Sequence, residues 1–145
     1  MFKKILVPTD GSPLSDKAIE AALKFAQGAG AKVYGVSVAE PRHALNMSEG
    51  SSVIDADDYA RQMLGAAQNH VDKLERAARA ANVECETLVA QSFNPYEEII
   101  AAAKEYGCDA IFMASHGRKG LSALFVGSET QKVLSHSTIP VLVLR

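Results

Sequence analysis

Short apolar runs rich in β-branched residues alternate with segments of helical periodicity along the chain, and this alternation is what most constrains the fold. Five runs are predicted strands: residues 3–7, 32–38, 83–90, 109–114 and 139–144. Strands that alternate with helices form a parallel sheet whose faces the helices cover. We therefore predict an α/β fold, an open five-stranded parallel sheet with helices on both faces, formed as one domain by residues 1–145.

Four helical segments separate the predicted strands. We expect them from Pro13 to about Gly28, from about Ala56 to Asn82, from Pro95 to Gly107, and from Ser128 to about His136. Ser12 and Asn94 are suitable N-cap residues, and the sequence SETQ at residues 128–131 has the pattern of a capping box. From Ala39 to about Asp55 no period holds, and a functional lid and plain disorder both remain open for this loop.

Charge and cysteine content argue against several classes of protein. Fifteen basic and seventeen acidic residues give a net charge of −2, whereas domains that bind nucleic acid usually carry a basic excess. Cys85 and Cys108 are too few for a disulfide framework, which favours a reducing, cytoplasmic location. No apolar run approaches the length of a membrane span. From the charge balance we therefore expect no nucleic-acid partner, and from the lack of a long apolar run we expect no membrane partner.

Two predicted strands end in segments that suit an anionic ligand. The first is followed by PTDGS (residues 8–12) and the fourth by SHGRKG (residues 115–120). Gly127 and Ser128 then begin the last helix, whose unpaired N–H groups favour negative charge. If the two strands are neighbours, Asp10 can accept hydrogen bonds from ribose hydroxyl groups while the glycine loop holds phosphates. The pattern favours a nucleotide over free phosphate.

Each of these features also has a purely structural interpretation. Glycines of this loop can serve turns alone, Asp10 can be a turn residue, and the Ser128 hydroxyl group can serve only as a helix cap. Arg118 and Lys119 fit a solvated loop face. His116 has no identifiable nucleophile beside it, so we assign no catalytic residue. The other histidines have no metal-ligand spacing, so we assign no metal ligand: His43, His70 and His136.

The chain also resembles the universal stress proteins over its whole length. The resemblance rests on the opening KKILVPTDGS and on the tail MASHGRKGLSALFVGSETQKVLSHSTIPVLVLR. The nucleotide-binding branch of that family carries the motif G-x2-G-x9-G-S/T, in which Gly117 and the pair Gly127-Ser128 stand at matching positions. The first glycine of the motif is replaced by Ala114. The resemblance implies the strand order 3-2-1-4-5 of the adenine nucleotide alpha hydrolase-like fold.

The resemblance further implies a site for ATP or a related adenine nucleotide, with or without Mg²⁺. Asp10 would hold the ribose, the end of the second strand would meet the adenine, and the last helix would surround the phosphates. The residues implied are Pro8, Thr9, Asp10, Ser37, Val38, Met113, Ala114, His116, Gly117, Gly127, Ser128, Glu129 and Thr130.

Two further expectations concern assembly and activity. Pro140 inside the last strand indicates a sheet edge, and the family pairs this strand, here Ile139 to Leu144, in a homodimer. The function implied is that of a stress-linked sensor or regulator with at most slow hydrolysis. A true nucleotide hydrolase or transferase and a ligand-free interaction or chaperone-like homodimer remain alternatives, and Ala114 favours the second of these.

Overall fold

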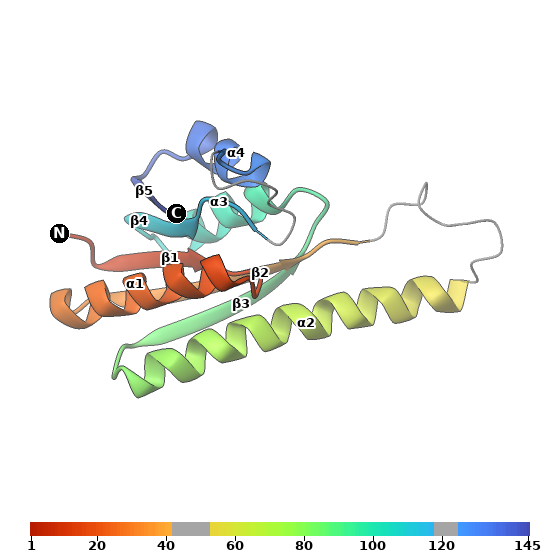
Figure 1. Cartoon of the computed structure of the whole chain (residues 1–145), viewed down its shortest axis with the longest axis horizontal. Helices are drawn as coiled ribbons and strands as arrows, with labels where there is room; N and C mark the ends of the chain where they lie inside the picture. Colours follow the sequence, from red (N-terminus) through yellow and green to blue (C-terminus); the bar gives the residue numbers. More distant parts are fainter. Residues whose placement is uncertain (42–52, 118–124) are drawn as a thin grey trace.

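The computed structural model describes residues 1–41, 53–117 and 125–145, with side chains in the second range described from residue 56 onward. Its elements follow the predicted alternation of strands and helices (Figure 1). They are β1 (Lys4–Pro8), α1 (Pro13–Ala29), β2 (Lys32–Ala39), α2 (Val53–Ala80), β3 (Cys85–Gln91), α3 (Pro95–Glu105), β4 (Ala110–Ala114), α4 (Ser128–His136) and β5 (Val141–Leu144). Arg118, Lys119 and Gly120 lie outside the described residues, as does most of the loop from Ala39 to about Asp55.

The five strands form one parallel sheet in the order β3-β2-β1-β4-β5, which confirms the predicted order 3-2-1-4-5. β1 lies in the middle, where Ile5 pairs with Val33 of β2 on one side and with Ala110 of β4 on the other. The chain leaves β1 toward β2 and later returns to the other side of β1 as β4. The carboxyl ends of β1 and β4 therefore flank the point at which the strand order reverses, where ligands bind in open parallel sheets.

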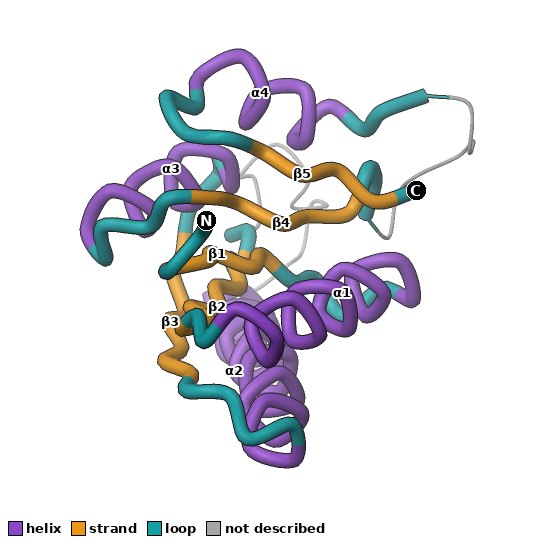
Figure 2. Tube along the Cα trace, turned by 90° about the vertical axis from the view of Figure 1, so that its left-hand side faces the viewer, coloured by secondary structure: helices purple, strands orange, loops and turns teal. Residues whose placement is uncertain are grey.

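Helices cover both faces of the sheet, as Figure 2 shows. Alternate residues of the central strands point to opposite faces, so Ile5 and Val7 pack with α1 and α2 while Leu6 packs with α3 and α4. Both clusters are closed to solvent, with Ile5, Leu6 and Val7 each 0% exposed. Burial on both faces explains why β1 is an apolar run without polar alternation. This double layer fixes the position of the strand ends.

The long helix α2 packs closely against Gly35 of β2. A Cβ atom built at Gly35 would lie 3.0 and 3.2 Å from the two Cδ atoms of the fully buried Leu74. The inner stripe of α2 continues through Ala67, Val71 and Ala78, all of which are buried. The absence of a side chain at Gly35 therefore allows α2 to lie directly on β2.

Three predicted boundaries are wrong by a few residues. β5 begins at Val141, so Pro140 lies just before the strand and not inside it. Its carbonyl oxygen still accepts a hydrogen bond from the Ile111 N–H at 2.9 Å, which continues the pairing without needing a proline donor. α2 begins at Val53 and not near Ala56, and β3 begins only at Cys85. The edge position expected for the last strand is confirmed, because β5 ends the sheet.

Within the described ranges, no helix is long and apolar enough to cross a membrane.

Candidate functional site

The turn after β1 and the loop after β4 meet at Asp10 and Gly117. A Cβ atom at Gly117 would overlap Oδ2 of Asp10 and would lie 3.3 Å from its Cγ. These two residues are far apart in the sequence, and only the pairing of β1 with β4 brings them together. The structure thus places the predicted carboxylate and the predicted glycine loop against each other.

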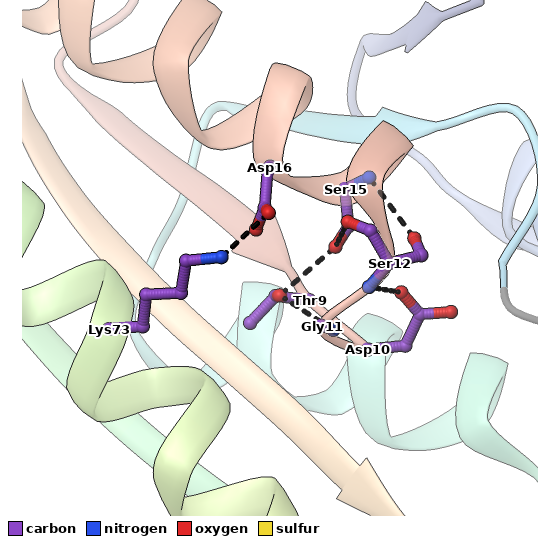
Figure 3. A network of polar contacts seen from close by, with 7 residues as sticks. All are labelled: Thr9, Asp10, Gly11, Ser12, Ser15, Asp16 and Lys73. Carbon is purple, nitrogen blue, oxygen red and sulfur yellow. Dashed lines mark hydrogen bonds and ion pairs between the residues drawn. The ribbon is translucent and has the colours of Figure 1, made fainter.

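A network of short hydrogen bonds shapes the turn that carries Asp10 (Figure 3). The Ser12 N–H donates to Oδ1 of Asp10 at 3.0 Å, and the Gly11 N–H donates to Oγ1 of Thr9 at 3.3 Å. The Thr9 N–H in turn donates to the carbonyl oxygen of Val36 at 2.9 Å, which ties the turn to the end of β2. Gly11 has a φ of 75°, a conformation that glycine adopts without strain. The Asp10 carboxylate is therefore oriented by its own turn.

Ser12 caps the first helix, as the sequence predicted. Its Oγ accepts a hydrogen bond from the Ser15 N–H at 3.2 Å, and Pro13 is the first helical residue. Ser12 is 5% exposed and Ser15 is 3% exposed, so both hydroxyl groups lie beneath the turn and not on its outer surface. The polar end of β1 thus continues directly into a well-capped helix.

The start of α4 differs from the predicted capping box. Ser128 is the first helical residue and Gly127 is the N-cap, with no side-chain cap from the described residues. Gln131 donates through Nε2 to the carbonyl oxygen of Val126 at 2.6 Å and so does not complete a reciprocal cap with Ser128. The Ser128 hydroxyl group therefore does not serve as the N-cap. Helical geometry leaves the first N–H groups of α4 without partners inside the helix.

Two contacts hold the start of α4 against the end of β4. The Gly127 N–H donates to the carbonyl oxygen of Ser115 at 2.6 Å, and Oγ1 of Thr130 donates to the carbonyl oxygen of Ala114 at 3.0 Å. A Cβ atom at Gly127 would lie 3.2 Å from Cα of His116, so this approach leaves little room for a side chain. The N–H of Gly127 and the hydroxyl hydrogen of Thr130 are thus engaged within the protein, and the positive end of α4 is held beside the end of β4.

Glu129 has a role that the sequence did not reveal. Its Oε2 accepts a hydrogen bond from the Tyr96 N–H at 2.9 Å, in the first turn of α3, while its Oε1 pairs with Nζ of Lys132 at 3.0 Å. Asn94 is the predicted N-cap of α3 but makes no side-chain cap hydrogen bond. A carboxylate from α4 therefore satisfies an N–H group at the start of α3, which joins the two helices.

At the end of β2, the predicted adenine contacts turn their side chains inward. Ser37 is 2% exposed, and its Oγ lies 3.3 Å from Nδ1 of His70 on α2. Sequence reasoning missed His70, although it lies three residues after the buried Ala67 and four before the buried Leu74, on the inner stripe of α2. Val38 is half-buried and packs toward α3. Any ligand contact here would therefore come mainly from the strand backbone.

The remaining predicted residues line the end of β4 and the loop beyond it. Met113 is 6% exposed and belongs to the core beneath α3 and α4, while Ala114 is 8% exposed. His116 is half-buried, with its Nδ1 3.1 Å from Oγ of Ser115. Pro8 is the last residue of β1.

Among the described residues, no group of three or more His, Cys, Asp or Glu side chains could hold a metal ion.

Open spaces also occur away from this site. A groove of about 390 Å³ lies between α1 and α2, and its lining includes Asp16, Leu23 and Lys73. A second hollow of about 330 Å³ lies near Lys3 and Lys32, at the opposite end of the strands. We place the candidate site at Asp10 and Gly117 because a carboxylate, a glycine loop and a helix start converge there. The larger groove is lined mainly by the sides of two helices, α1 and α2.

Comparison with known proteins gives a consistent result. The sequence model described as "Universal stress protein family" matches residues 1–145. Universal stress protein YxiE of Bacillus subtilis is 33% identical over 153 residues, and the match covers 100% of both chains. The solved structure of MJ0577 from Methanocaldococcus jannaschii has a TM-score of 0.83 at 27% identity, covering 99% of this chain and 96% of that one. A universal stress protein solved in complex with cAMP has a TM-score of 0.72 at 24% identity, covering 99% and 97% respectively, which supports the shared fold.

Proposed function

Because this chain belongs to the universal stress protein family, we propose that it binds an adenine nucleotide, ATP or a close relative, in the crevice between β1 and β4. The observation that carries the proposal is the contact between Asp10 and Gly117 beside the start of α4. A carboxylate for ribose hydroxyl groups and a helix start for phosphates lie within one crevice. Neither feature alone would specify a nucleotide.

The phosphates would lie at the start of α4. Ser128, Glu129 and Thr130 are its first residues, and their N–H groups have no acceptors inside the helix. The Ser128 hydroxyl group, which is not the N-cap, would donate a further hydrogen bond. The Glu129 carboxylate is neutralised by Lys132 and by the start of α3, which reduces its repulsion of a bound phosphate. Mg²⁺ would accompany ATP as a counterion to the phosphates.

The ribose would lie beside Asp10 and the adenine beside the backbone at Ser37 and Val38. A carboxylate oxygen accepts more than one hydrogen bond, so Asp10 can hold its own turn and a ribose hydroxyl group together. The solved relative with bound cAMP supports an adenine nucleotide as the ligand class for this fold.

Ala114 is compatible with this proposal. It is a regular residue of β4 with 8% exposure, and its carbonyl oxygen holds Thr130 in place. The methyl group is thus mostly packed against the protein, where it takes little space from a nucleotide. We expect Ala114→Gly to change nucleotide affinity only slightly.

We propose a regulatory role in the cytoplasm, with at most slow hydrolysis and no direct contact with nucleic acid or membrane. Switching between a nucleotide-bound and a nucleotide-free form would provide the signal. His116 contacts Ser115, in the loop that would lie beside the phosphates, and we give it no part as a general base. Both cysteines are free thiols, as a reducing compartment requires.

A second candidate function is a homodimer that acts through protein contacts alone. The observation that favours it is the exposed apolar surface at the sheet edge, where Leu142 of β5 is 47% exposed and Leu134 of α4 is 45% exposed. We propose that residues 139–144 pair with a second copy, because an uncovered apolar edge strand invites such pairing. Nucleotide binding and this dimer are compatible with each other.

The nucleotide content of the purified protein separates the two functions. The protein is denatured and filtered, and the released small molecules are identified by mass spectrometry. We expect ATP, ADP or AMP in near-stoichiometric amount, or else an empty protein whose melting temperature rises with added ATP and Mg²⁺. Ligand at about 100 times its Kd should stabilise the fold by roughly 2.7 kcal/mol. An empty protein without a thermal shift would leave only the ligand-free dimer.

A further inference from the structure

The buried hydroxyl groups beneath the β1–α1 turn point to a role for Ser15. We propose that Ser15 is a positioning residue for ribose recognition, which acts through Thr9 and Ser12 to hold Asp10 in place. The inference rests on the proposed nucleotide site and names a residue that lies outside the motifs used above. Figure 3 shows Ser15 in the first turn of α1, with dashed lines that join it to Thr9 and to Ser12.

The direction of each hydrogen bond follows from counting protons. Oγ of Ser15 donates to the carbonyl oxygen of Ser12 at 2.9 Å, which uses its single hydrogen. The 3.2 Å contact between Oγ of Ser15 and Oγ1 of Thr9 therefore has Thr9 as the donor. The lone pairs of Thr9 then remain for the Gly11 N–H, which donates to them at 3.3 Å. The hydroxyl groups form one directed series that runs from Gly11 through Thr9 and Ser15 to Ser12.

The same residues hold the turn from its other side. The Ser15 N–H donates to Oγ of Ser12 at 3.2 Å, and the Ser12 N–H donates to Oδ1 of Asp10 at 3.0 Å. Ser15 thus contacts Ser12 through both its backbone and its side chain. Since Ser12 contacts the Asp10 carboxylate directly, displacement of Ser12 would change the direction of that carboxylate.

Ser15 acts indirectly because it is out of reach of a ligand. Ser15 is 3% exposed, and Thr9, its hydrogen-bond partner, is 5% exposed. A change from Ser15 to Ala would remove the acceptor of the Thr9 hydroxyl group while leaving the helix backbone unchanged. The Thr9 hydroxyl group would then be buried without an acceptor, and the oxygen that accepts from the Gly11 N–H would be held less firmly.

The first turn of α1 has a separate attachment to the rest of the fold. Oδ2 of Asp16 pairs with Nζ of Lys73 on α2 at 2.6 Å, on the side of the helix away from Asp10 (Figure 3). Six buried residues further hold the helix against the sheet: Ser15, Ala18, Ile19, Ala22, Leu23 and Ala26. Loss of the Ser15 hydroxyl group should therefore loosen the turn while α1 stays in place.

The test compares Ser15→Ala with Ser135→Ala in calorimetric titrations with ATP and with ATP analogues lacking the 2′- or the 3′-hydroxyl group. Ser135 is a matched control, because its Oγ donates to the Gln131 carbonyl oxygen at 2.9 Å, also within a helix, but it is exposed near the end of α4. Ser15→Ala should weaken ATP binding roughly 5- to 10-fold, as for one hydrogen bond. It should weaken binding of the analogue that lacks the recognised hydroxyl group much less than it weakens binding of ATP. The preference of Ser15→Ala for ATP over that analogue should therefore fall toward the preference shown by Asp10→Asn.

A second readout needs no ligand. Amide exchange at Gly11 and Ser12 should accelerate in Ser15→Ala and remain at the wild-type rate in Ser135→Ala, with the melting transition recorded for both. Thr9→Val breaks the same series, so its effect on the Kd for ATP should not add to that of Ser15→Ala. Additive effects would overturn the directed series.

The outcomes distinguish this inference from the proposed function. If wild-type protein binds none of the nucleotides, the proposed function fails and the role of Ser15 in ribose recognition fails with it. If wild-type protein binds ATP but Ser15→Ala keeps both its affinity and its selectivity, only the inference about Ser15 is overturned. Equal weakening of ATP and both analogues, with unchanged amide exchange, would also overturn it.

Discussion

At the residue scale, the absence of a side chain at position 117 leaves room for the Asp10 carboxylate. A side chain at Gly117 would overlap the Asp10 carboxylate, whose Oδ1 is already held by the Ser12 N–H. We predict that Gly117→Ala displaces Asp10 and weakens ATP binding by roughly tenfold or more, measured by calorimetry. Gly65→Ala is the matched control, because a Cβ atom there meets nothing within 4 Å. An unchanged Kd in Gly117→Ala would show that Asp10 does not contact the nucleotide.

The two thiols give a prediction about pH. Burial, with Glu75 nearby, raises the pKa of Cys85 to about 11, and burial, with Asp109 nearby, raises the pKa of Cys108 to about 11. Because only the thiolate reacts, alkylation of the folded protein should still accelerate between about pH 9 and 10, whereas the urea-unfolded chain should approach a plateau. A plateau near pH 9 in the folded protein would contradict these pKa values.

The raised pKa values of Cys85 and Cys108 also predict how the free energy of unfolding depends on pH. Between the ordinary thiol pKa of 9.0 and the folded value of about 11, the folded state binds more protons than the unfolded state. The contribution of the two thiols to the free energy of unfolding is therefore complete below about pH 9 and is lost as the pH rises from about 9 to about 11. Chemical denaturation at a series of pH values should show the decline.

Several residue roles were beyond sequence reasoning because they depend on contacts between distant elements. Asp10, Gly117 and Gly127 were predicted from local chemistry and spacing, and the structure brings all three to neighbouring strand ends. The structural interpretation of Ser128 as the N-cap, left open from the pattern SETQ, is wrong because Gly127 is the N-cap and Ser128 is the first helical residue. Glu129 instead accepts a hydrogen bond from the Tyr96 N–H at the start of α3. A cap supplied by another helix leaves no signal in the local sequence.

At the element scale, α2 packs tightly against β2 at Gly35. Gly35→Ala would place a Cβ atom 3.0 Å from Leu74 and 3.4 Å from Cγ2 of Thr87, so the tightly buried Leu74 side chain must give way by a few tenths of an ångström. We predict a loss of about 1–3 kcal/mol in the free energy of unfolding, measured by urea denaturation. Gly28→Ala in α1 is the control, since it meets nothing within 4 Å and should stabilise the helix by about 0.5–1 kcal/mol. Equal stability of Gly35→Ala and wild type would mean that α2 is less tightly packed than described.

Helix and strand types were predicted better than their ends. Periodicity identified the four helices and five strands found in the described parts of the chain, because each must bury an apolar face. The ends of β3 and β5 were misplaced since pairing with a neighbouring strand, and not composition, decides where a strand begins. Pro140 shows this well, because its carbonyl oxygen joins the pairing although the residue lies outside β5.

At the scale of the whole molecule, the alternation of strands and helices was sufficient for a parallel sheet, but not for its strand order. The order came from family resemblance, and the pairing of β1 with both β2 and β4 confirms it. Periodicity reports which face of an element is buried and carries no information on its neighbours. The adjacency of β1 and β4, on which the proposed site depends, therefore could not be predicted from periodicity; the resemblance implied it, and the structure confirms it.

The proposed dimer is also a prediction about the whole molecule. Leu142→Arg would place a charge on the exposed apolar side of β5, and we expect it to convert a dimer into a monomer in sedimentation velocity. Leu64→Arg on α2, where the leucine is 37% exposed, should leave the dimer intact. A wild-type protein that sediments only as a monomer at micromolar concentration would contradict the proposed pairing.

The most direct test of the nucleotide site is a calorimetric titration of nucleotide-stripped protein with ATP and Mg²⁺. The crevice between β1 and β4 predicts saturable binding near one nucleotide per chain, which is strongly weakened in Gly117→Ala and retained in Gly65→Ala. Absence of saturable binding by the wild-type protein, or equal binding by Gly117→Ala, would contradict the assignment of the site to Asp10 and Gly117.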